Sequence, residues 1–471
     1  MPLYEPVPLL LPDLLGRVHF EAVGGAGMSP VALCYAALGV PTSGCDRADS
    51  PVLGQLERAG VRVAVGHDAA HVSDIDTLVV SSAIRAENAE LVAARRAGVR
   101  VWHRSTALGA LMLERDGVAI TGTHGKTTVS AMILGALVAA GVDPSGVIGA
   151  TVAATGQSYR LGRGEIFVVE ADESDGSYLQ YPASTIVLTN IEADHLDNWG
   201  TADAYVAGFE RLTRGEPVRQ VILDGDDPGT AALAVRLADA PARVITVGAA
   251  PACDYRLTGL SQDGRQAHAR LEVAGESHVL RLAVPGEYNL HNAALAFAAG
   301  RELGAPAEGL LDGLAAFRGA SRRFQLVGEV RGLRVIDDYA HHPTEVGATL
   351  TAARSLVGAG RLVVCFQPHL YTRTRDFARP LGEALALADL VVVTDVFPAR
   401  EDPLPGVTGE LVAQAVAAAG AEVVYLADKS TLPEALAATV RPGDVVLTMG
   451  AGDIGQVGPA LVRLKGGSAD G

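Results

Sequence analysis

The sequence predicts an α/β protein built from several domains. Its 471 residues correspond to roughly three domains at about 150 residues each. Only 5% of the chain is aromatic, so the 49% hydrophobic fraction consists mostly of alanine, valine and leucine, and 54 residues are glycine. Short apolar runs followed by glycine turns and alanine-rich segments recur along the chain. This pattern is typical of buried strands joined to helices.

Three stretches repeat this order of apolar run, turn and helical segment. In the first, we expect a strand at 18–23, a turn at 24–27, a helix at 30–38 and strands at 61–65 and 78–81. In the second, we expect a strand at 117–121, a turn at 122–125, a helix at 127–140 and strands at 166–170, 185–190 and 220–224. In the third, strands at 333–337, 361–366, 390–397, 422–426 and 444–449 alternate with helices. Alternation predicts parallel sheets, and we place the domains at 1–113, 114–321 and 322–471.

The charge and the N-terminal residues exclude several classes of protein. The chain carries 38 basic and 54 acidic residues, a formal net charge of −16, which argues against binding to a nucleic-acid backbone. A local site can still bind an anionic ligand. The first residues have no basic start and are interrupted by prolines and Asp13, so they resemble neither a secretory signal nor a transit peptide. No apolar run reaches the ~18–20 residues of a membrane span. We expect a cytoplasmic protein without membrane or nucleic-acid partners.

The four cysteines form no CxxC pair and no zinc-binding spacing. They are Cys34, Cys45, Cys253 and Cys365. We interpret them as reduced, mostly buried thiols, rather than as disulfides or metal ligands.

The most informative segment is TGTHGKTT at 121–128. It follows an apolar run and precedes a predicted helix, the context that a phosphate-binding loop requires. Glycines let backbone N–H groups converge on phosphate oxygens, and the helix N-terminus adds partial positive charge. Lys126 is expected to meet the β- and γ-phosphates, and the Thr127 hydroxyl to bind Mg²⁺. The predicted nucleotide contacts in this loop are Gly122, Thr123, His124, Gly125, Lys126, Thr127 and Thr128.

The loop is tighter than the general phosphate-binding motif, because Ile120 stands where that motif has its first glycine. A glycine turn with a surface lysine is the alternative interpretation.

Two acidic segments follow predicted strands in the same domain. They are EADESD at 170–175 and NIEADHLD at 190–197. The C-terminal ends of strands are where ligands of α/β proteins bind, and Mg²⁺ prefers oxygen ligands. A histidine beside them is either a ligand or an orienting group. EADESD alone is typical of a solvated acidic turn, whereas its combination with the phosphate loop favours a metal site.

Together these motifs resemble those of the Mur ligases, the ATP-dependent amide-forming enzymes of peptidoglycan synthesis. Further matches are PGEYNLHNA at 285–293, RRF at 322–324, DDYAHHP at 337–343, FQPH at 366–369 and GAGD at 450–453. The resemblance runs in the expected order from His19 to Gly455. HFEAVGGAGMS at 19–29, SSAI at 81–84 and FQPHLYTRT at 366–374 most resemble the first ligase of the series.

The resemblance implies an α/β chain of three domains that bind the UDP-sugar, ATP and the amino acid in turn. These would be a Rossmann-like UDP-binding domain, a central P-loop ATPase-type domain and a C-terminal Rossmann-like domain. It also implies that the lactyl carboxylate of UDP-N-acetylmuramate attacks the γ-phosphate of ATP. The amine of L-alanine would then attack the acyl phosphate. ATP with Mg²⁺, or Mn²⁺, is the implied cofactor set, and the chain is expected to be a monomer or homodimer.

The same resemblance implies roles for individual residues. Lys126, His195 and Arg323 would be catalytic, and Thr127, Glu170 and His195 would bind metal. Asn289 and Asn292 would lie near adenine, Asp338 near the ribose, and Arg323 at the γ-phosphate; a hinge salt bridge is the alternative for Arg323. An arginine suits the alanine carboxylate, so His369 and Arg373 are candidates for the amino-acid site, unless they only line a domain interface.

In the first domain, the glycine-rich loop of Gly24, Gly25, Ala26 and Gly27 would cradle the UDP diphosphate. Asp46 follows at about the 20-residue spacing of an acid that contacts a ribose. His67, Ser81 and Ser82 are further UDP-sugar candidates, each with a purely structural role as the alternative.

Three residues depart from the family pattern. Ala22 and Arg400 replace usual glycines, and Tyr288 replaces a common histidine. Ala22 bears on the diphosphate turn, Arg400 on the amino-acid site and Tyr288 on the adenine contacts.

Other functions remain as alternatives. The ligase that re-attaches recycled tripeptide to UDP-N-acetylmuramate shares the phosphate loop, although EADEYD-like and FDHAD-like segments would be expected there. Folylpolyglutamate synthases lack a glycine-loop UDP domain. An NAD-dependent oxidoreductase would use the loop at 24–27 and Asp46, but would leave GTHGKTT, EADESD and RRF unexplained. Beside ligases and oxidoreductases, a third class of function is a non-catalytic switch that binds ATP.

Overall fold

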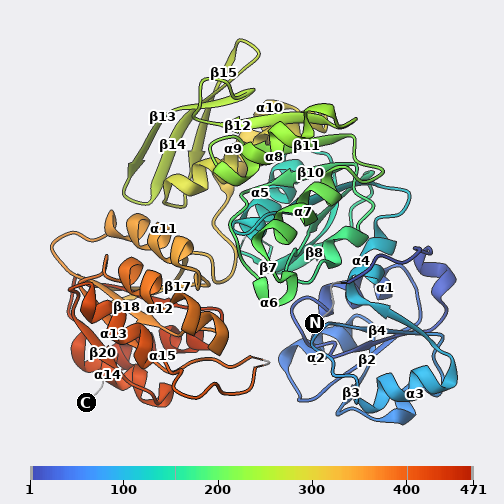
Figure 1. The fold of residues 1–471 in the computed structure, drawn as a ribbon, viewed down its shortest axis with the longest axis horizontal. Helices are drawn as coiled ribbons and strands as arrows, with labels where there is room; N and C mark the ends of the chain where they lie inside the picture. The colour runs from blue at the N-terminus through green and yellow to red at the C-terminus, as the bar shows by residue number, and fades with distance from the viewer. Residues whose placement is uncertain (1–3, 154, 400, 468–471) are drawn as a thin grey trace. The chain divides into compact units, whose positions relative to one another are not determined.

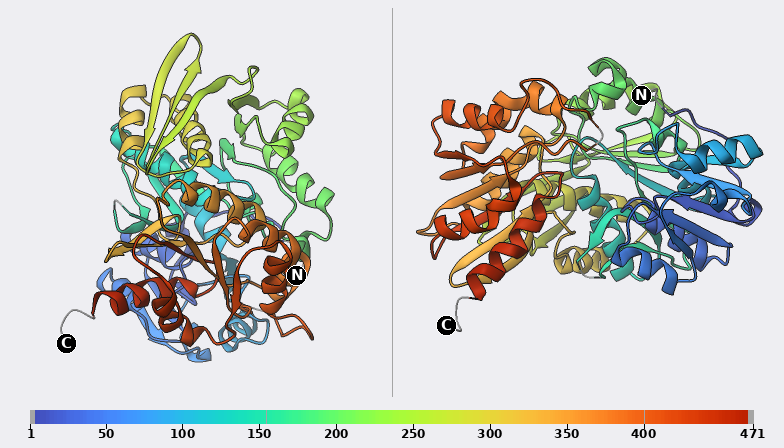
Figure 2. Two further views of the ribbon diagram at one scale, coloured as in Figure 1. Left: turned by 90° about the vertical axis from the view of Figure 1, so that its left-hand side faces the viewer. Right: turned by 90° about the horizontal axis from the view of Figure 1, so that it is seen from below.

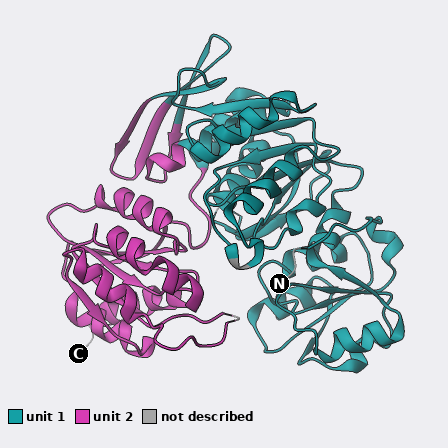
Figure 3. Ribbon diagram, viewed as in Figure 1, with its two compact units in different colours: residues 1–258, 270–280, 291–316 teal, residues 259–269, 281–290, 317–471 magenta. Residues whose placement is uncertain are grey.

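The computed structural model describes residues 4–153, 155–399 and 401–467 and confirms the α/β class. Its strands form three sheets of five, ten and six strands, with helices between most successive strands (Figure 1). The chain divides into two compact units (Figure 3). Unit 1 runs to residue 258 and includes 270–280 and 291–316, and unit 2 takes the remainder. The predicted domain boundaries after residues 113 and 321 stay predictions.

The first sheet is parallel throughout, with the strand order β3-β2-β1-β4-β5. Its strands are β1 (Val18–Glu21), β2 (Thr42–Asp46), β3 (Arg62–Val65), β4 (Thr77–Val80) and β5 (Arg100–His103). Its helices are η1 (Pro12–Leu15), α1 (Ser29–Ala37), α2 (Pro51–Arg58), η2 (Ala69–Val72), α3 (Ala89–Ala97) and α4 (Arg104–Leu111). This is the strand order of nucleotide-binding doubly wound sheets, which bind ligands at the carboxyl ends where the order reverses. Here that point is β1.

The second sheet has the order β15-β14-β13-β12-β11-β10-β6-β9-β7-β8. The first of its strands are β6 (Asp116–Thr121), β7 (Ser145–Val152), β8 (Gln157–Arg160), β9 (Ile166–Glu170) and β10 (Thr185–Leu188). The others are β11 (Gln220–Asp224), β12 (Arg243–Gly248), β13 (Tyr255–Asp263), β14 (Gln266–Val273) and β15 (Glu276–Leu282). Its helices are α5 (Lys126–Ala139), η3 (Ser177–Gln180), α6 (Leu196–Trp199), α7 (Ala202–Thr213), α8 (Pro228–Arg236), η4 (Leu237–Asp239), α9 (Glu287–Glu302) and α10 (Ala307–Ala316).

The third sheet has the order β16-β17-β21-β18-β19-β20. Its strands are β16 (Gln325–Val330), β17 (Leu333–Asp338), β18 (Leu362–Phe366), β19 (Leu390–Val393), β20 (Val423–Tyr425) and β21 (Val445–Met449). Its helices are α11 (Pro343–Arg354), α12 (Tyr371–Leu385), α13 (Glu410–Ala418), η5 (Lys429–Thr431), α14 (Leu432–Thr439), η6 (Ile454–Gln456) and α15 (Val457–Gly466).

Helices cover both faces of this third sheet (Figure 2). Along β18, Leu362, Val364 and Phe366 pack with α11, α12 and α13, whereas Val363 and Cys365 pack with α14 and α15. Burial on both faces explains why these strands are continuous apolar runs in the sequence.

The predicted parallel sheets also contain antiparallel pairs. β8 pairs with β7, and β16 with β17, in antiparallel fashion. β13, β14 and β15 are joined by two-residue connections, which only antiparallel neighbours allow. The strand expected at 390–397 ends at Val393. Every described helix falls short of the length and apolarity needed to cross a membrane.

Candidate active site

The segment at 121–128 forms the predicted strand–loop–helix unit. β6 ends at Thr121 and α5 begins at Lys126. Gly122 has a φ of 124°, and a Cβ there would collide with the Thr189 hydroxyl. Glycine is therefore required at this position. The loop delivers its backbone directly to the N-terminus of α5, as phosphate binding requires.

The loop is held by the segment that follows β10, the parallel neighbour of β6. The Asn190 Oδ1 accepts the His124 N–H at 2.8 Å, and the Thr189 hydroxyl donates to the His124 carbonyl at 2.5 Å. The Thr123 hydroxyl donates to the Glu192 carbonyl at 2.9 Å. TNIEAD thus braces the phosphate loop, a role that Thr189 and Asn190 were not predicted to have. The sequence did not show that the strands before the phosphate loop and before TNIEAD, β6 and β10, lie side by side in the sheet.

Lys126 lies against its own loop and an acidic neighbour. Its Nζ donates to the carbonyls of Gly122 at 2.7 Å and Thr123 at 3.1 Å. It also pairs with Glu173 Oε2 at 2.7 Å, and Glu173 is fully buried. Burial, which by itself lowers the pKa of this lysine, is outweighed by Glu173 and Asp172, so the pKa is raised and Lys126 stays charged.

Carboxylates outnumber the positive charge at Lys126. Glu170, Asp172 and Glu173 all act on its ammonium group. Burial raises the pKa of Glu173 to about 7 against the opposing effect of Lys126. The pKa of Asp172 falls to about 2, because Lys126, His195 and Arg104 outweigh its burial. A site with one lysine and three carboxyl groups favours a further cation.

Two of the three predicted metal ligands meet at the end of β9. The Thr127 hydroxyl donates to Glu170 Oε1 at 2.8 Å, and the Gly149 N–H donates to Glu170 Oε2 at 2.6 Å. The third, His195, has a left-handed backbone with a φ of 53°. Its Nε2 lies 3.8 Å from Glu173 Oε1. Oxygen donors of this kind fit a hard divalent cation, so the residues present suit Mg²⁺.

In the first sheet, the glycine-rich loop leaves β1 at its carboxyl end. The Gly24 N–H donates to Asp46 Oδ2 at 2.9 Å, so Asp46 braces the loop. Ala22 adopts a φ of 57°, which explains why glycine suits this position better. A Cβ on Gly27 would collide with the Arg104 guanidinium, so this arginine lies against the predicted diphosphate cradle. Gly25 and Ala26 complete the turn.

The other UDP-sugar candidates lie after neighbouring strands. The Ser82 hydroxyl donates to Asp175 Oδ2 at 2.9 Å, linking SSAI to EADESD within unit 1. Ser81 directly follows β4, and its carbonyl accepts the Ile84 N–H at 3.0 Å. His67 Nδ1 lies 3.3 Å from Cys45 Sγ.

In unit 2, the two arginines of RRF differ sharply. Arg322 donates to Asp337 Oδ2 at 3.1 Å and to the carbonyls of Gly452 at 2.8 Å and Gly450 at 2.6 Å. Arg323 lies over the Tyr339 ring at 5.0 Å, with Nη1 3.9 Å from Glu345 Oε1. Arg322 therefore fixes the GAGD loop, whereas Arg323 lies beside Tyr339, Glu345 and Asp338. Asp338 is a predicted nucleotide contact, so Arg323 lies next to a candidate nucleotide residue.

The candidate nucleotide residues near α9 are well buried. Asp338 accepts the N–H groups of Phe324 at 2.7 Å and Ala340 at 2.8 Å, and burial raises its pKa to about 6 although Arg323 opposes this. Asn289 Nδ2 donates to the Pro285 carbonyl at 2.6 Å. Burial raises the pKa of Tyr288, which packs on the core of the third sheet. Asn292 belongs to unit 1, where its side-chain oxygen faces Gly125 of the phosphate loop.

The two amino-acid candidates lie at the end of β18. The His369 ring stacks on Phe397 with centroids 5.8 Å apart, and it meets His341 edge-on at 5.8 Å. Arg373 lies in the first turn of α12. Arg400 lies outside the described residues.

Comparison with known proteins identifies the family. Three family models match consecutive parts of the chain: "Mur ligase family, catalytic domain" at 17–116, "Mur ligase middle domain" at 120–300 and "Mur ligase, glutamate ligase domain" at 322–452. The chain is 56% identical over 471 residues to the UDP-N-acetylmuramate–L-alanine ligase of Cutibacterium acnes, with 100% of both chains covered. The chain belongs to the Mur ligase family. The predicted resemblance is confirmed.

Solved structures of Mur ligases share this fold. The UDP-N-acetylmuramate–alanine ligase MurC from Thermotoga maritima superposes with a TM-score of 0.81 at 28% identity, covering 95% of this chain and 98% of that one. The murein peptide ligase of Psychrobacter arcticus gives 0.72 at 24% identity, covering 96% and 99%, and shows the fold alone. The predicted three-domain architecture is confirmed, and the chain is a member of an ATP-using ligase family. The oxidoreductase alternative loses its support.

For this Mur ligase, sequence reasoning missed residues that act at a distance. Glu173 and Asp172 were visible within EADESD, but only the fold turns them toward Lys126. Arg104 carries no motif at all and reaches the loop at Gly27 because α4 begins directly after β5.

Proposed function

We propose that this Mur ligase joins L-alanine to UDP-N-acetylmuramate, with conversion of ATP to ADP and phosphate, in peptidoglycan synthesis. The observation that carries the proposal is the 56% identity, over both full chains, to a relative named for this reaction. The loop geometry at Lys126, Thr127 and Glu170 supports ATP as the phosphoryl donor.

In the first step, a lactyl carboxylate oxygen attacks the γ-phosphorus and ADP leaves, which gives an acyl phosphate. The amine of L-alanine then attacks the acyl carbon, the C–O bond to phosphate breaks, and the amine loses a proton to give the amide. A carboxylate and a triphosphate repel each other, so positive groups must stabilise their approach. We assign this role to Lys126 in the phosphate loop and to Arg323, whose guanidinium acts on the nucleotide candidate Asp338.

We assign Mg²⁺, or Mn²⁺, to the Thr127 hydroxyl and the Glu170 carboxylate, with His195 beside Glu173 as the further candidate. When bound, the cation supplies positive charge to the phosphate oxygens. Thr127 presents its hydroxyl and Glu170 its carboxylate from the ends of α5 and β9, held in place by Gly149.

For the remaining substrates, we assign the UDP diphosphate to the loop at 24–27, with Arg104 against it. The alanine carboxylate is assigned to the neighbourhood of His369 and Arg373. We also propose a cytoplasmic location, because ATP is the donor and the four cysteines are free thiols.

The test is phosphate release by the purified chain with ATP, Mg²⁺ and UDP-N-acetylmuramate, with L-alanine added or omitted. Release that requires both the sugar nucleotide and L-alanine supports the proposal. Release with the tripeptide but not with L-alanine would assign the chain to recycling instead, and no release with either would overturn both. Glycine and L-serine belong in the same series, because a pocket for one methyl group discriminates by only ~1–3 kcal/mol. Sedimentation velocity separates monomer from homodimer.

A further inference from the structure

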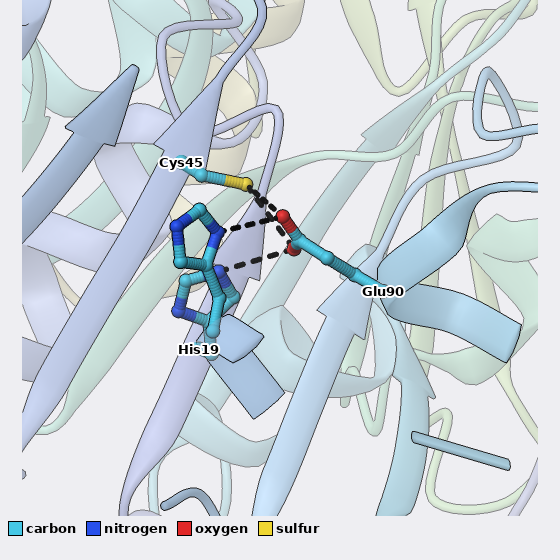
Figure 4. A group of neighbouring side chains, drawn as sticks. His19, Cys45 and Glu90 are labelled. Atoms are coloured by element: carbon cyan, nitrogen blue, oxygen red, sulfur yellow. Dashed lines mark hydrogen bonds and ion pairs between the residues drawn. The ribbon is translucent and has the colours of Figure 1, made fainter. Parts of the chain in front are cut away.

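Four side chains with metal-binding atoms meet on one face of the first sheet (Figure 4). They are His19 of β1, Cys45 of β2, His71 of η2 and Glu90 of α3. One ligand atom from each lies within 4.8 Å of all the others. His19, Cys45 and Glu90 are buried, whereas the His71 side chain is 24% exposed and leaves a route from solvent. The proposed ATP and UDP-sugar assignments use none of the four.

The spacing of these atoms resembles the first shell of a tetrahedral ion. Cys45 Sγ lies 3.0 and 3.2 Å from the two Glu90 oxygens, His71 Nδ1 lies 2.9 Å from Glu90 Oε1, and His19 Nε2 lies 3.3 Å from Glu90 Oε2. Zinc bonds of about 2.0–2.3 Å place neighbouring ligands of a tetrahedron roughly 3.3–3.7 Å apart. The contacts to Glu90 thus need to lengthen by roughly half an ångström to hold an ion, and the remaining pairs of ligand atoms lie within 4.8 Å of one another.

The orientation of His19 suits a metal ligand. His19 is 3% exposed, and its Nε2 faces Glu90 Oε2 at 3.3 Å, an ion pair only when the ring is protonated, and makes no hydrogen bond among the described residues. The other ring nitrogen, Nδ1, bonds to Ser43 Oγ at 2.9 Å. Metal-binding histidines are commonly oriented in this way, with one nitrogen held and the other on the ion. Nearby, the oxygens of the buried Glu21 make no hydrogen bond among the described residues, and Oε1 lies 3.8 Å from His67 Nδ1; a buried carboxyl group in that state favours a neighbouring cation.

We propose that His19 Nε2, Cys45 Sγ, His71 Nδ1 and a Glu90 oxygen bind one Zn²⁺ ion. A thiolate and two imidazoles select zinc over the magnesium of the phosphate loop, which prefers oxygen ligands. One thiolate and one carboxylate balance the two charges of the ion. On binding, the Cys45 S–H bond breaks, its proton passes to solvent and an S–Zn bond forms, without any redox change. Four protein ligands leave no open position, so the site is structural.

The ion would link β1 and β2, which flank the glycine-rich loop, to the helices η2 and α3. Cys45 precedes Asp46, which holds the Gly24 N–H. Glu90 already accepts the Asp68 N–H at the start of η2, at 3.0 Å. This bond orients the Glu90 carboxylate before any ion binds.

The experiment measures metal content directly, apart from ligase activity. The full chain is stripped with chelator, equilibrated with Zn²⁺ in excess Mg²⁺ to occupy the phosphate loop, desalted and analysed by mass spectrometry for zinc. We expect one zinc per chain for the wild type and at least tenfold less for Cys45→Ser and His71→Asn. The control, Cys34→Ala, removes a buried thiol from α1 of the same domain and should retain zinc.

Cobalt gives an independent spectroscopic readout. Co²⁺ in the wild type and in Cys34→Ala should show a thiolate-to-metal charge-transfer band and the visible bands of tetrahedral cobalt, and Cys45→Ser should lack the charge-transfer band. Circular dichroism checks the fold of each variant; if Cys45→Ser unfolds, His71→Asn, on a partly exposed helix, decides. A wild type that retains no zinc, or variants that retain as much as the wild type, would overturn the proposal and leave a hydrogen-bonded cluster only.

Discussion

Replacing Lys126 by alanine is the most direct test of the phosphate site. The Nζ group lies at the loop that would hold the triphosphate and forms a 2.7 Å ion pair with Glu173. Losing one preorganised charge that acts on the transition state costs at least ~3 kcal/mol, or about a hundredfold in kcat/KM. We expect ligation to fall by that factor or more, measured as L-alanine-dependent phosphate release.

The contacts of Lys126 also determine how much Lys126→Ala lowers the free energy of unfolding. Lys126→Ala leaves Glu173 buried without its counter-charge, which in general is strongly destabilising. The pKa of Glu173 is already about 7, however, so at neutral pH it takes up a proton at a cost under ~1 kcal/mol. The lost hydrogen bonds to the Gly122 and Thr123 carbonyls add about 1 kcal/mol each. The free energy of unfolding should fall by about 1–3 kcal/mol, and the variant should stay folded.

Two further variants separate activity from stability. Lys465→Ala removes a lysine whose Nζ, among the residues that the structure describes, donates to the Val440 carbonyl at 3.3 Å alone, and it should leave both kcat/KM and the urea midpoint unchanged. Lys126→Ala combined with Glu173→Gln should recover part of the lost stability and none of the activity. A Lys126→Ala enzyme with kcat/KM within tenfold of the wild type would refute the assignment of the phosphate site.

Three other outcomes follow from the described contacts. Arg322→Ala should lower the melting temperature most, because it removes bonds to Asp337 and two carbonyls. Arg323→Ala removes contacts to Tyr339 and Glu345 but should lower kcat/KM by a much larger factor than Arg322→Ala does; the reverse pattern would exchange their roles. Glu170→Gln should raise the Mg²⁺ concentration for half-maximal phosphate release by about tenfold or more, and no change would remove it from the metal site. The pKa of Asp338 is about 6 in the fold against 3.8 for the free group, so its stabilisation is complete below pH 3.8 and lost as the pH rises through 6, by up to ~3 kcal/mol. In the Asp338→Asn variant, the urea midpoint should change less with pH between pH 3.8 and 6 than it does in the wild type. The same pH dependence in both proteins would show that Asp338 does not cause it.

The buried parallel strands could be predicted from the sequence, and the exposed strands could not. β9 and β11 have the predicted bounds, because strands covered on both faces are apolar throughout. In β13 only Tyr255 and Leu257 are buried, and the remaining positions are half-buried or exposed, so its polar residues resemble those of a loop. The strand expected at 390–397 ends at Val393, where Thr394 and Asp395 follow, and the apolar Val396 and Phe397 beyond them lie outside the strand.

For the candidate site, contiguous motifs were predictable because one turn of backbone holds them together. The loop at 121–128 is such a case: its glycines, lysine and threonine act from neighbouring positions. Its braces were not predictable in the same way. Asn190 acts on His124 only because β10 lies beside β6, and this register is a property of the sheet rather than of either motif.

The cysteine spacing illustrates the same limit at a longer range. Cys45 was interpreted as a thiol without a metal role, because no second cysteine or histidine stands at a zinc-finger distance along the chain. The parallel register places it opposite Glu21, two residues after His19 on the same face of β1, and the helices after β3 and β4 bring in the other donors. The register that forms the proposed zinc cluster also sets Asp46 against Gly24. An ion at Cys45 would therefore stiffen the turn that is assigned to the UDP diphosphate, and variants of the cluster should weaken binding of the sugar nucleotide more than binding of ATP.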